Sequence, residues 1–209
     1  MPGTMSQSDL VSDLQLVMND SAKSFKNARQ SMERHLLTAA ARLSEIRPQR
    51  LDGELNAVAD QALYVAPANI LAVSYVGWGD ALRRRHKPWD RSYPEAPPVA
   101  QVVDGASGRQ IRLTPAPTAG QIAALGAGIS YCYTASHTIG ALAVDTTVRT
   151  TDRELLLLAA VIAALRELAL RGVDKPVQLG PGTGSQARNG TPAGLLEAWQ
   201  KEWDWRAAR

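Results

Sequence analysis

The chain has 209 residues, of which 45% are apolar and 21% are charged, and its formal net charge is +3. This composition is typical of a globular protein and excludes wholesale disorder. So small a charge does not by itself indicate a nucleic-acid binder. The single cysteine, Cys132, excludes an internal disulfide framework and any zinc site built from several cysteines.

No segment predicts a membrane span. The longest apolar run covers residues 155–165, and charged residues flank it on both sides. It is too short to cross a bilayer. Residues 1–20 lack the basic start and apolar stretch of a signal peptide. We therefore expect a soluble protein that is made in the cytoplasm and does not contact a membrane.

Two helices are predicted at the start of the chain. Residues 6–18 carry apolar side chains at the i, i+3, i+4 and i+7 spacing of an amphipathic helix. A second helix is predicted from about Ser31 to Glu45. It should end at Arg47-Pro48, because proline lacks an amide donor and disfavours helix in the residue before it.

The middle of the chain, from Leu51 to about Ile139, is predicted to be rich in strands. Short strands are expected near residues 55–65 and 70–76, broken by Gly53, Pro67 and Asn69. Glycine-rich turn residues between 99–103 and 110–113 predict a β-hairpin. Alternating side chains predict a half-buried strand at 129–134, and Thr118 is expected to cap a short helix that ends at Gly126.

A basic segment interrupts this region at residues 83–91, and we expect it to be a surface loop. Arginine pairs with phosphate and tryptophan can stack on a base, so the segment is a candidate contact for DNA. An acidic patch on a neighbouring subunit is the alternative partner, and a merely solvated loop is the simplest interpretation. The residues concerned are Arg83, Arg84, Arg85, Lys87 and Trp89.

A third long helix is predicted from Thr151, with Thr151 and Glu154 as a capping box, to about Arg171, where Gly172 ends it. Its first turns are apolar on nearly every side, so neighbours must cover it all round. A subunit interface is one way to supply that cover. The candidate interface residues are Leu156, Leu157 and Val161.

The end of the chain combines a glycine-rich stretch with an amphipathic helix. Residues 180–185 have neither the lysine of a phosphate loop nor the third glycine of a dinucleotide motif, so residues 180–190 predict a linker. Thr191-Pro192 then begins a helix. One apolar stripe of that helix either folds back onto its own domain as core or binds a partner protein. We favour the partner, because the linker would let the helix reach one. The stripe consists of Leu195, Leu196, Trp199 and Trp203.

No catalytic, cofactor-binding or metal-binding residues are predicted. The three histidines, His35, His86 and His137, have no second ligand at metal-binding spacing. His137 could pair with Asp145 as a base, yet no nucleophile accompanies them, and a hydrogen-bonded structural histidine is the simpler interpretation.

In its order of elements the chain resembles the head-to-tail connector (adaptor) proteins of tailed bacteriophages. The resemblance covers most of residues 8–172. The segments that carry it are Asp13 to Asp20, Leu36 to Arg42, Arg47-Pro48, Leu63 to Pro67, Leu113 to Pro117 with Gly126, Tyr131 to His137, and Leu155 to Leu170.

This resemblance implies a mainly α, α+β fold. It would comprise a small helical bundle with an inserted β-rich region and an extended C-terminal arm that ends in a helix. The expected divisions are residues 1–50 for the N-terminal helices, 51–140 for the inserted region, 141–172 for the central bundle helix, and 173–209 for the arm and last helix.

The resemblance also implies a non-enzymatic virion protein of the neck. Twelve copies would form a ring below the portal protein and line the channel through which the genomic DNA passes. The C-terminal segment would dock on the portal, and the other face would receive a neck or tail-completion protein. Assembly would take place in the host cytoplasm. The alternative function is a nucleic-acid-binding protein that uses the basic loop Arg83–Lys87 and Trp89.

Overall fold

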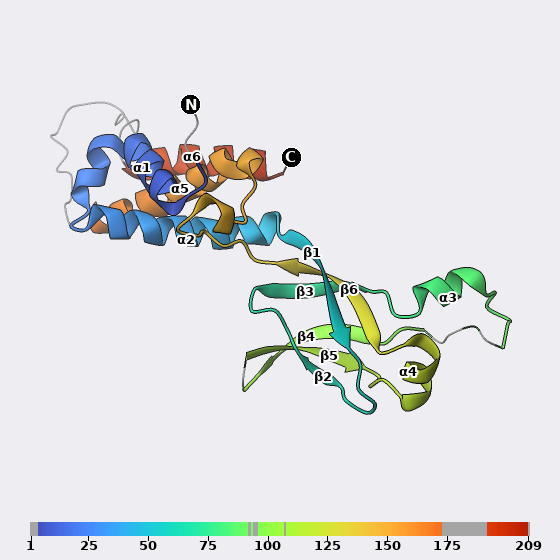
Figure 1. The fold of residues 1–209 in the computed structure, drawn as a ribbon. Helices are drawn as coiled ribbons and strands as arrows, with labels where there is room; N and C mark the ends of the chain where they lie inside the picture. The colour runs from blue at the N-terminus through green and yellow to red at the C-terminus, as the bar shows by residue number, and fades with distance from the viewer. Residues whose placement is uncertain (1–3, 92, 94–95, 107, 173–191, 209) are drawn as a thin grey trace, which may run out of the picture. The chain divides into compact units, whose positions relative to one another are not determined.

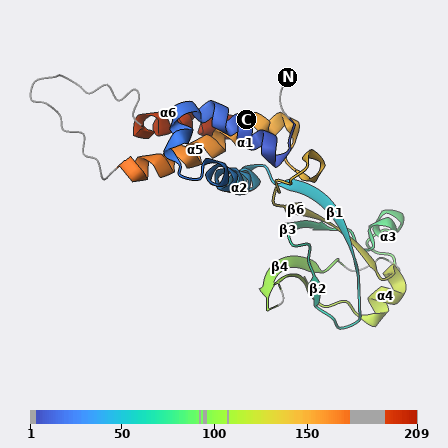
Figure 2. The ribbon, with the colours of Figure 1, turned by 60° about the vertical axis from the view of Figure 1, so that its left-hand side comes forward.

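The structure is a computed structural model that describes residues 4–91, 93, 96–106, 108–172 and 192–208. The chain forms two compact units, which are drawn in Figures 1 and 2. The helical unit comprises Met1–Arg47 and His137–Arg209, and the β unit comprises Pro48–Ser136. The β unit is thus inserted between two parts of the helical unit. The fold is α+β and mainly α, as the sequence predicts.

In its described residues the helical unit has four long helices: α1 (Gln7–Met18), α2 (Ala28–Ile46), α5 (Arg153–Gly172) and α6 (Pro192–Ala207). Three short 3-10 turns accompany them: η1 (Asn19–Ser24), η2 (Ala143–Asp145) and η3 (Thr150–Asp152). Helix α5 packs against α1, α2 and α6. The almost continuously apolar helix is therefore covered by other helices of the same chain.

The two N-terminal helices confirm the predicted periodicity. The Ser6 side chain caps α1 by accepting the amide N–H of Asp9 at 3.3 Å. Helix α2 begins three residues earlier than predicted and ends before Arg47 and the proline that follows it. Helix α5 begins two residues later than expected, because Thr151 lies in the η3 turn and not at the helix cap.

The core of the helical unit is formed by one face each of α1 and α2 together with most of the first half of α5. Its most deeply buried large side chains are Leu10, Leu14, Met32, Leu36, Leu43, Leu156 and Ile162.

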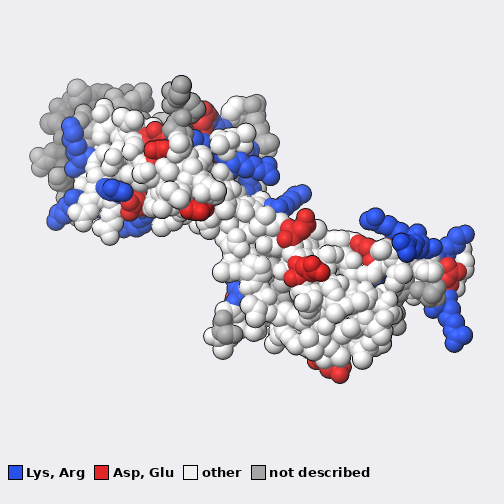
Figure 3. Space-filling view, viewed as in Figure 1, with Lys and Arg blue, Asp and Glu red and all other residues white. Residues whose placement is uncertain are grey.

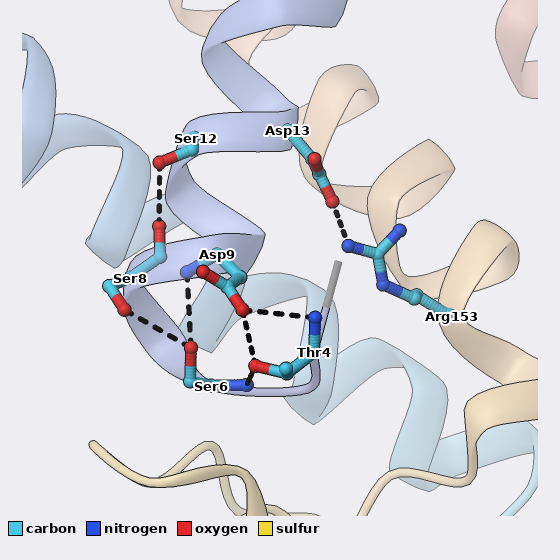
Figure 4. Close-up of polar contacts among 7 residues, drawn as sticks. All are labelled: Thr4, Ser6, Ser8, Asp9, Ser12, Asp13 and Arg153. Atoms are coloured by element: carbon cyan, nitrogen blue, oxygen red, sulfur yellow. Dashed lines mark hydrogen bonds and ion pairs between the residues drawn. The ribbon is translucent and has the colours of Figure 1, made fainter. Parts of the chain in front are cut away.

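A polar network fixes the start of α1 and joins α1 to α5 (Figure 4). Asp9 accepts hydrogen bonds from the backbone N–H of Thr4, at 2.9 Å, and from its hydroxyl. These bonds lower the pKa of Asp9 below its ordinary value. One turn later, Asp13 pairs with Arg153, the first residue of α5, whose side chain is 14% exposed. This partly buried ion pair links the first turns of α1 to the first residue of α5.

The β unit contains two three-stranded antiparallel sheets. In one sheet the order is β1 (Gln49–Asn56), β6 (Gly128–Ala135), β3 (Ile70–Val76). In the other it is β2 (Leu63–Val65), β5 (Gly108–Thr114), β4 (Val99–Gly105). Both sheets contribute to one core, whose most buried side chains are Ile70, Trp78, Ile111, Leu113 and Ile129.

Three local predictions in this unit are confirmed. Strands β4 and β5 form the predicted hairpin. Strand β6 alternates as expected, with Ile129, Tyr131 and Tyr133 buried and the residues between them more exposed. Thr118 caps α4 (Ala119–Leu125) in a capping box with Gln121, and Gly126 ends that helix with a φ of 87°.

Two predictions in this unit are wrong. Residues 83–85, predicted as the start of the surface loop at 83–91, belong to a helix, α3 (Asp80–Arg85). An aspartate in its first turn and arginines in its last turn match the helix dipole and offset its short length. Gly53 does not break a strand but lies inside β1, opposite Tyr131. A Cβ atom there would come within 2.5 Å of the Tyr131 ring, so the close approach requires glycine.

Candidate interaction surfaces

The amphipathic stripe of α6 packs onto its own helical unit. Trp203 is 3% exposed, and the Arg42 guanidinium lies 4.5 Å from the centre of its ring. Leu196 and Trp199 are partly buried against the same core, whereas Leu195 is 42% exposed. The structure therefore follows the alternative in which the stripe is local core. The predicted linker at residues 180–190 and the Thr191 cap lie outside the described residues.

The candidate subunit-interface residues of α5 are also covered within the chain. Leu156 is fully buried and Val161 is 4% exposed, while Leu157 is partly buried against the same core. The sequence assigned these residues to an interface because α5 needed cover on all sides. Helices α1, α2 and α6 supply that cover, so the physical reason for the assignment no longer holds.

In the basic segment, the Arg83 side chain is bonded within the fold, whereas several other side chains are exposed to solvent. The Arg83 guanidinium is held against its own backbone by the Trp78 carbonyl oxygen at 2.7 Å and by Asp80 at 3.2 Å. Arg84, Arg85 and Lys87 are exposed, and Trp89 is 77% exposed with the Lys87 ammonium 5.2 Å from its ring centre. Lysine and arginine side chains gather at this end of the β unit in Figure 3.

A groove with a volume of about 550 Å³ opens beside this basic segment, between α3 and α4. Its apolar lining comes from α3, α4 and the chain after Arg91, and includes Trp78, Leu82, Leu125, Ala124 and Pro97. The Trp78 indole donates to the Gly126 carbonyl oxygen at 2.9 Å, which fixes the ring against the end of α4. His86 and Arg91 bring basic side chains into the lining.

Hydrogen bonds hold His137 and Cys132 within the fold. His137 Nε2 lies 2.8 Å from the Arg47 carbonyl oxygen, and its amide donates to Ser44 Oγ at 2.8 Å, which joins it to the end of α2. The Cys132 thiol donates to Asp52 Oδ1 at 2.9 Å, a hydrogen bond that, with burial and the Asp52 charge, raises the pKa of the thiol. The thiol is therefore poorly activated. In the described part of the chain, no group of three or more His, Cys, Asp or Glu side chains could hold a metal ion.

Sequence reasoning missed the groove and the exposed Trp205 of α6. In the sequence Arg91 is only the end of a basic run, whereas in the structure its side chain lines the groove. Trp205 lies one position off the predicted stripe and is 53% exposed. Its exposure was readable from that offset, whereas the groove depends on α3 and α4 meeting in space.

No protein-family model and no curated protein matches this chain. Among solved structures it is similar to one described as "Neck of native GTA particle computed with C12 symmetry". The identity is 16%, the alignment covers 94% of this chain and 91% of that chain, and the TM-score is 0.29. No helix in the described part of the chain is sufficiently long and apolar to traverse a membrane.

Proposed function

We propose that this chain is a structural protein of a phage-type neck, a head-to-tail connector that assembles as a ring below the portal protein. The observation that carries the proposal is the insertion of a two-sheet β unit between α2 and α5 of a small helical bundle. That arrangement is the one implied by the resemblance of residues 8–172 to the connector family.

In this proposal twelve copies surround a channel for genomic DNA, and a neck or tail-completion protein binds the face away from the portal. Ring contacts require apolar side chains that the chain does not cover itself. Leu16 of α1 and Leu37 of α2 are 77% and 54% exposed, so they are better candidates than the buried Leu156 and Val161. Leu157 stays a proposed contact at the edge of the core.

Helix α6 remains the proposed portal-docking element, but the side chains proposed to contact the portal differ from the stripe predicted from the sequence. Trp203 already serves the core of the helical unit, and Leu196 and Trp199 are partly committed to it. The exposed Leu195 and Trp205 are the apolar side chains of α6 that a partner could bury. Tryptophan is a common anchor at protein interfaces.

The test is to mix the purified protein with the portal ring encoded in the same genome and to image the product by electron microscopy. The expected result is a second ring stacked on the portal in matching copy number. Failure of the folded protein to associate with an intact portal would overturn the connector function.

Two exposed tryptophans provide a matched pair of variants. Trp205→Ala should weaken attachment to the portal by about tenfold or more, as for an anchor residue. Trp89→Ala in the β unit removes an exposed tryptophan of the same size and should leave attachment unchanged. Equal attachment of both variants would reject α6 as the docking element without affecting the ring itself.

A further inference from the structure

We propose that the groove between α3 and α4 binds an acidic segment of a partner protein, with apolar side chains seated in the groove and carboxylates on its basic margin. This inference does not depend on the neck function, because it rests only on residues of the β unit. It concerns a surface that neither the resemblance nor the portal-docking proposal uses.

Apolar side chains form the wall of the groove. Leu82 projects from α3, Leu125 and Ala124 come from α4, and Pro97 closes the side formed by the chain that leads to β4. Trp78 is 2% exposed, and its indole hydrogen bond keeps it in place. A preformed concave apolar surface of this kind accepts the side chains of a partner with little reorganisation cost.

Charge is unbalanced around the groove. Residues 80–97, which form one side of it, contain five Lys or Arg side chains and three Asp or Glu side chains, of which Glu95 lies outside the described residues. Two of these carboxylates are engaged: Asp80 by Tyr75 and Arg83, and Asp90 by the Lys87 amide N–H at 2.8 Å. His86 and Arg91 line the groove, and Arg84, Arg85 and Lys87 are exposed on the same segment, so this side of the groove has a net positive margin. This margin complements carboxylates on a partner.

A protein segment fits these features better than duplex DNA. Phosphates require only exposed cations and make no use of an apolar groove. The exposed Trp89, the candidate for stacking on a base, does not line the groove, and Arg83 is held by the Trp78 carbonyl oxygen and by Asp80. An acidic segment with apolar anchors uses both the groove and its margin.

The experiment measures binding of fluorescent twelve-residue peptides to the full chain by anisotropy. Three peptides carry Asp and Glu with Leu, Phe or Trp as the apolar residue. A charge-matched control peptide has Ser at the apolar positions, and a sign-reversed control has Lys at the acidic positions. At least one acidic, apolar peptide should bind, about tenfold or more tightly than either control. Absence of binding by all three would overturn the proposal.

Neighbouring alanines of α4 provide the decisive pair of variants. Ala124 and Ala123 are both exposed, but Ala124 lines the groove and Ala123 does not. Glutamate is tolerated in a helix at either position. Ala124→Glu should weaken peptide binding about tenfold or more by placing a like charge in the groove, whereas Ala123→Glu should change it by less than about twofold. Equal effects of the two variants would overturn the assignment of the groove.

Charge reversal separates the protein partner from DNA. The variant Arg91→Glu, in the groove lining, should weaken peptide binding, and Arg112→Glu, an exposed arginine on β5, is the control. Duplex DNA of twenty base pairs is tested in parallel. If DNA binds with a steep salt dependence, excludes the peptides and is insensitive to Ala124→Glu, the segment is a DNA contact and the proposal is wrong.

Discussion

At the scale of single residues, the Cys132–Asp52 hydrogen bond determines the chemistry of the one thiol. Because the bond and the nearby carboxylate favour the protonated thiol, the pKa of Cys132 is raised and little thiolate forms near neutral pH. Asp52→Asn should speed alkylation by iodoacetamide several-fold at pH 8. Asp104→Asn, at an exposed position on β4, should leave the rate unchanged, and a similar rate in both variants would show that the carboxylate has no such effect.

His35 makes stability depend on pH. It is 4% exposed, packs edge-on against Phe25 and lies 3.3 Å from Glu167, with Arg34 and Arg171 close by. Burial lowers its pKa more strongly than Glu167 raises it. The unfolded chain therefore takes up the proton first, so the stability contributed by neutral His35 is present above the unfolded pKa of about 6.5 and is lost as pH falls below it.

Urea unfolding between pH 7 and pH 5 tests this prediction. The free energy of unfolding should decrease with falling pH, by at most about 1.4 kcal/mol per pH unit for one proton. His35→Gln should flatten the slope whatever its effect on stability at pH 7. An identical slope in the variant and the unaltered protein would contradict the role of His35.

A substitution at Gly53 tests the close packing between β1 and the Tyr131 ring. Gly53→Ala should destabilise the protein by about 1–3 kcal/mol, because the added methyl group meets the buried Tyr131 ring. Gly120→Ala in α4 is the control, since its methyl group meets no atom closer than 4.0 Å and alanine favours helix. Thermal unfolding should therefore separate two substitutions of the same chemical size, and equal shifts would be evidence against the contact.

At the scale of an element, α6 is held by one face and exposes another. Trp203→Ala should cost about 3–5 kcal/mol of folding stability, as expected for a buried tryptophan. Trp205→Ala, two residues later and 53% exposed, should change stability by less than about 0.5 kcal/mol. Chemical unfolding of both variants measures the difference. Comparable losses would mean that α6 is not packed as the structure has it.

At the scale of the whole molecule, the two units have separate cores. One buried cluster draws only on residues of the helical unit and the other only on residues of the β unit. Destabilisation should therefore stay within the unit that carries the substitution. In hydrogen exchange, Gly53→Ala should increase exchange in β1, β3 and β6, and Trp203→Ala should increase it in α2, α5 and α6. Spreading of either effect through both units would show that they unfold as one.

Local patterns in the sequence determined the features that depend on neighbouring residues. The spacing of apolar residues predicted α1, α2 and α5, turn residues predicted the β4–β5 hairpin, and Thr118 and Gly126 marked the ends of α4. These features require only contacts between residues close in the chain, so periodicity and capping rules suffice.

Tertiary structure alone decided which surfaces are covered. The apolar α5 needed cover that a neighbouring subunit was one way to supply, and α1, α2 and α6 of the same chain cover it, with Trp203 in that core. Gly53 looked like a strand breaker until its partner across the sheet proved to be Tyr131, 78 positions away in the chain. Burial depends on contacts between distant segments, which amphipathic patterns cannot assign to a particular partner.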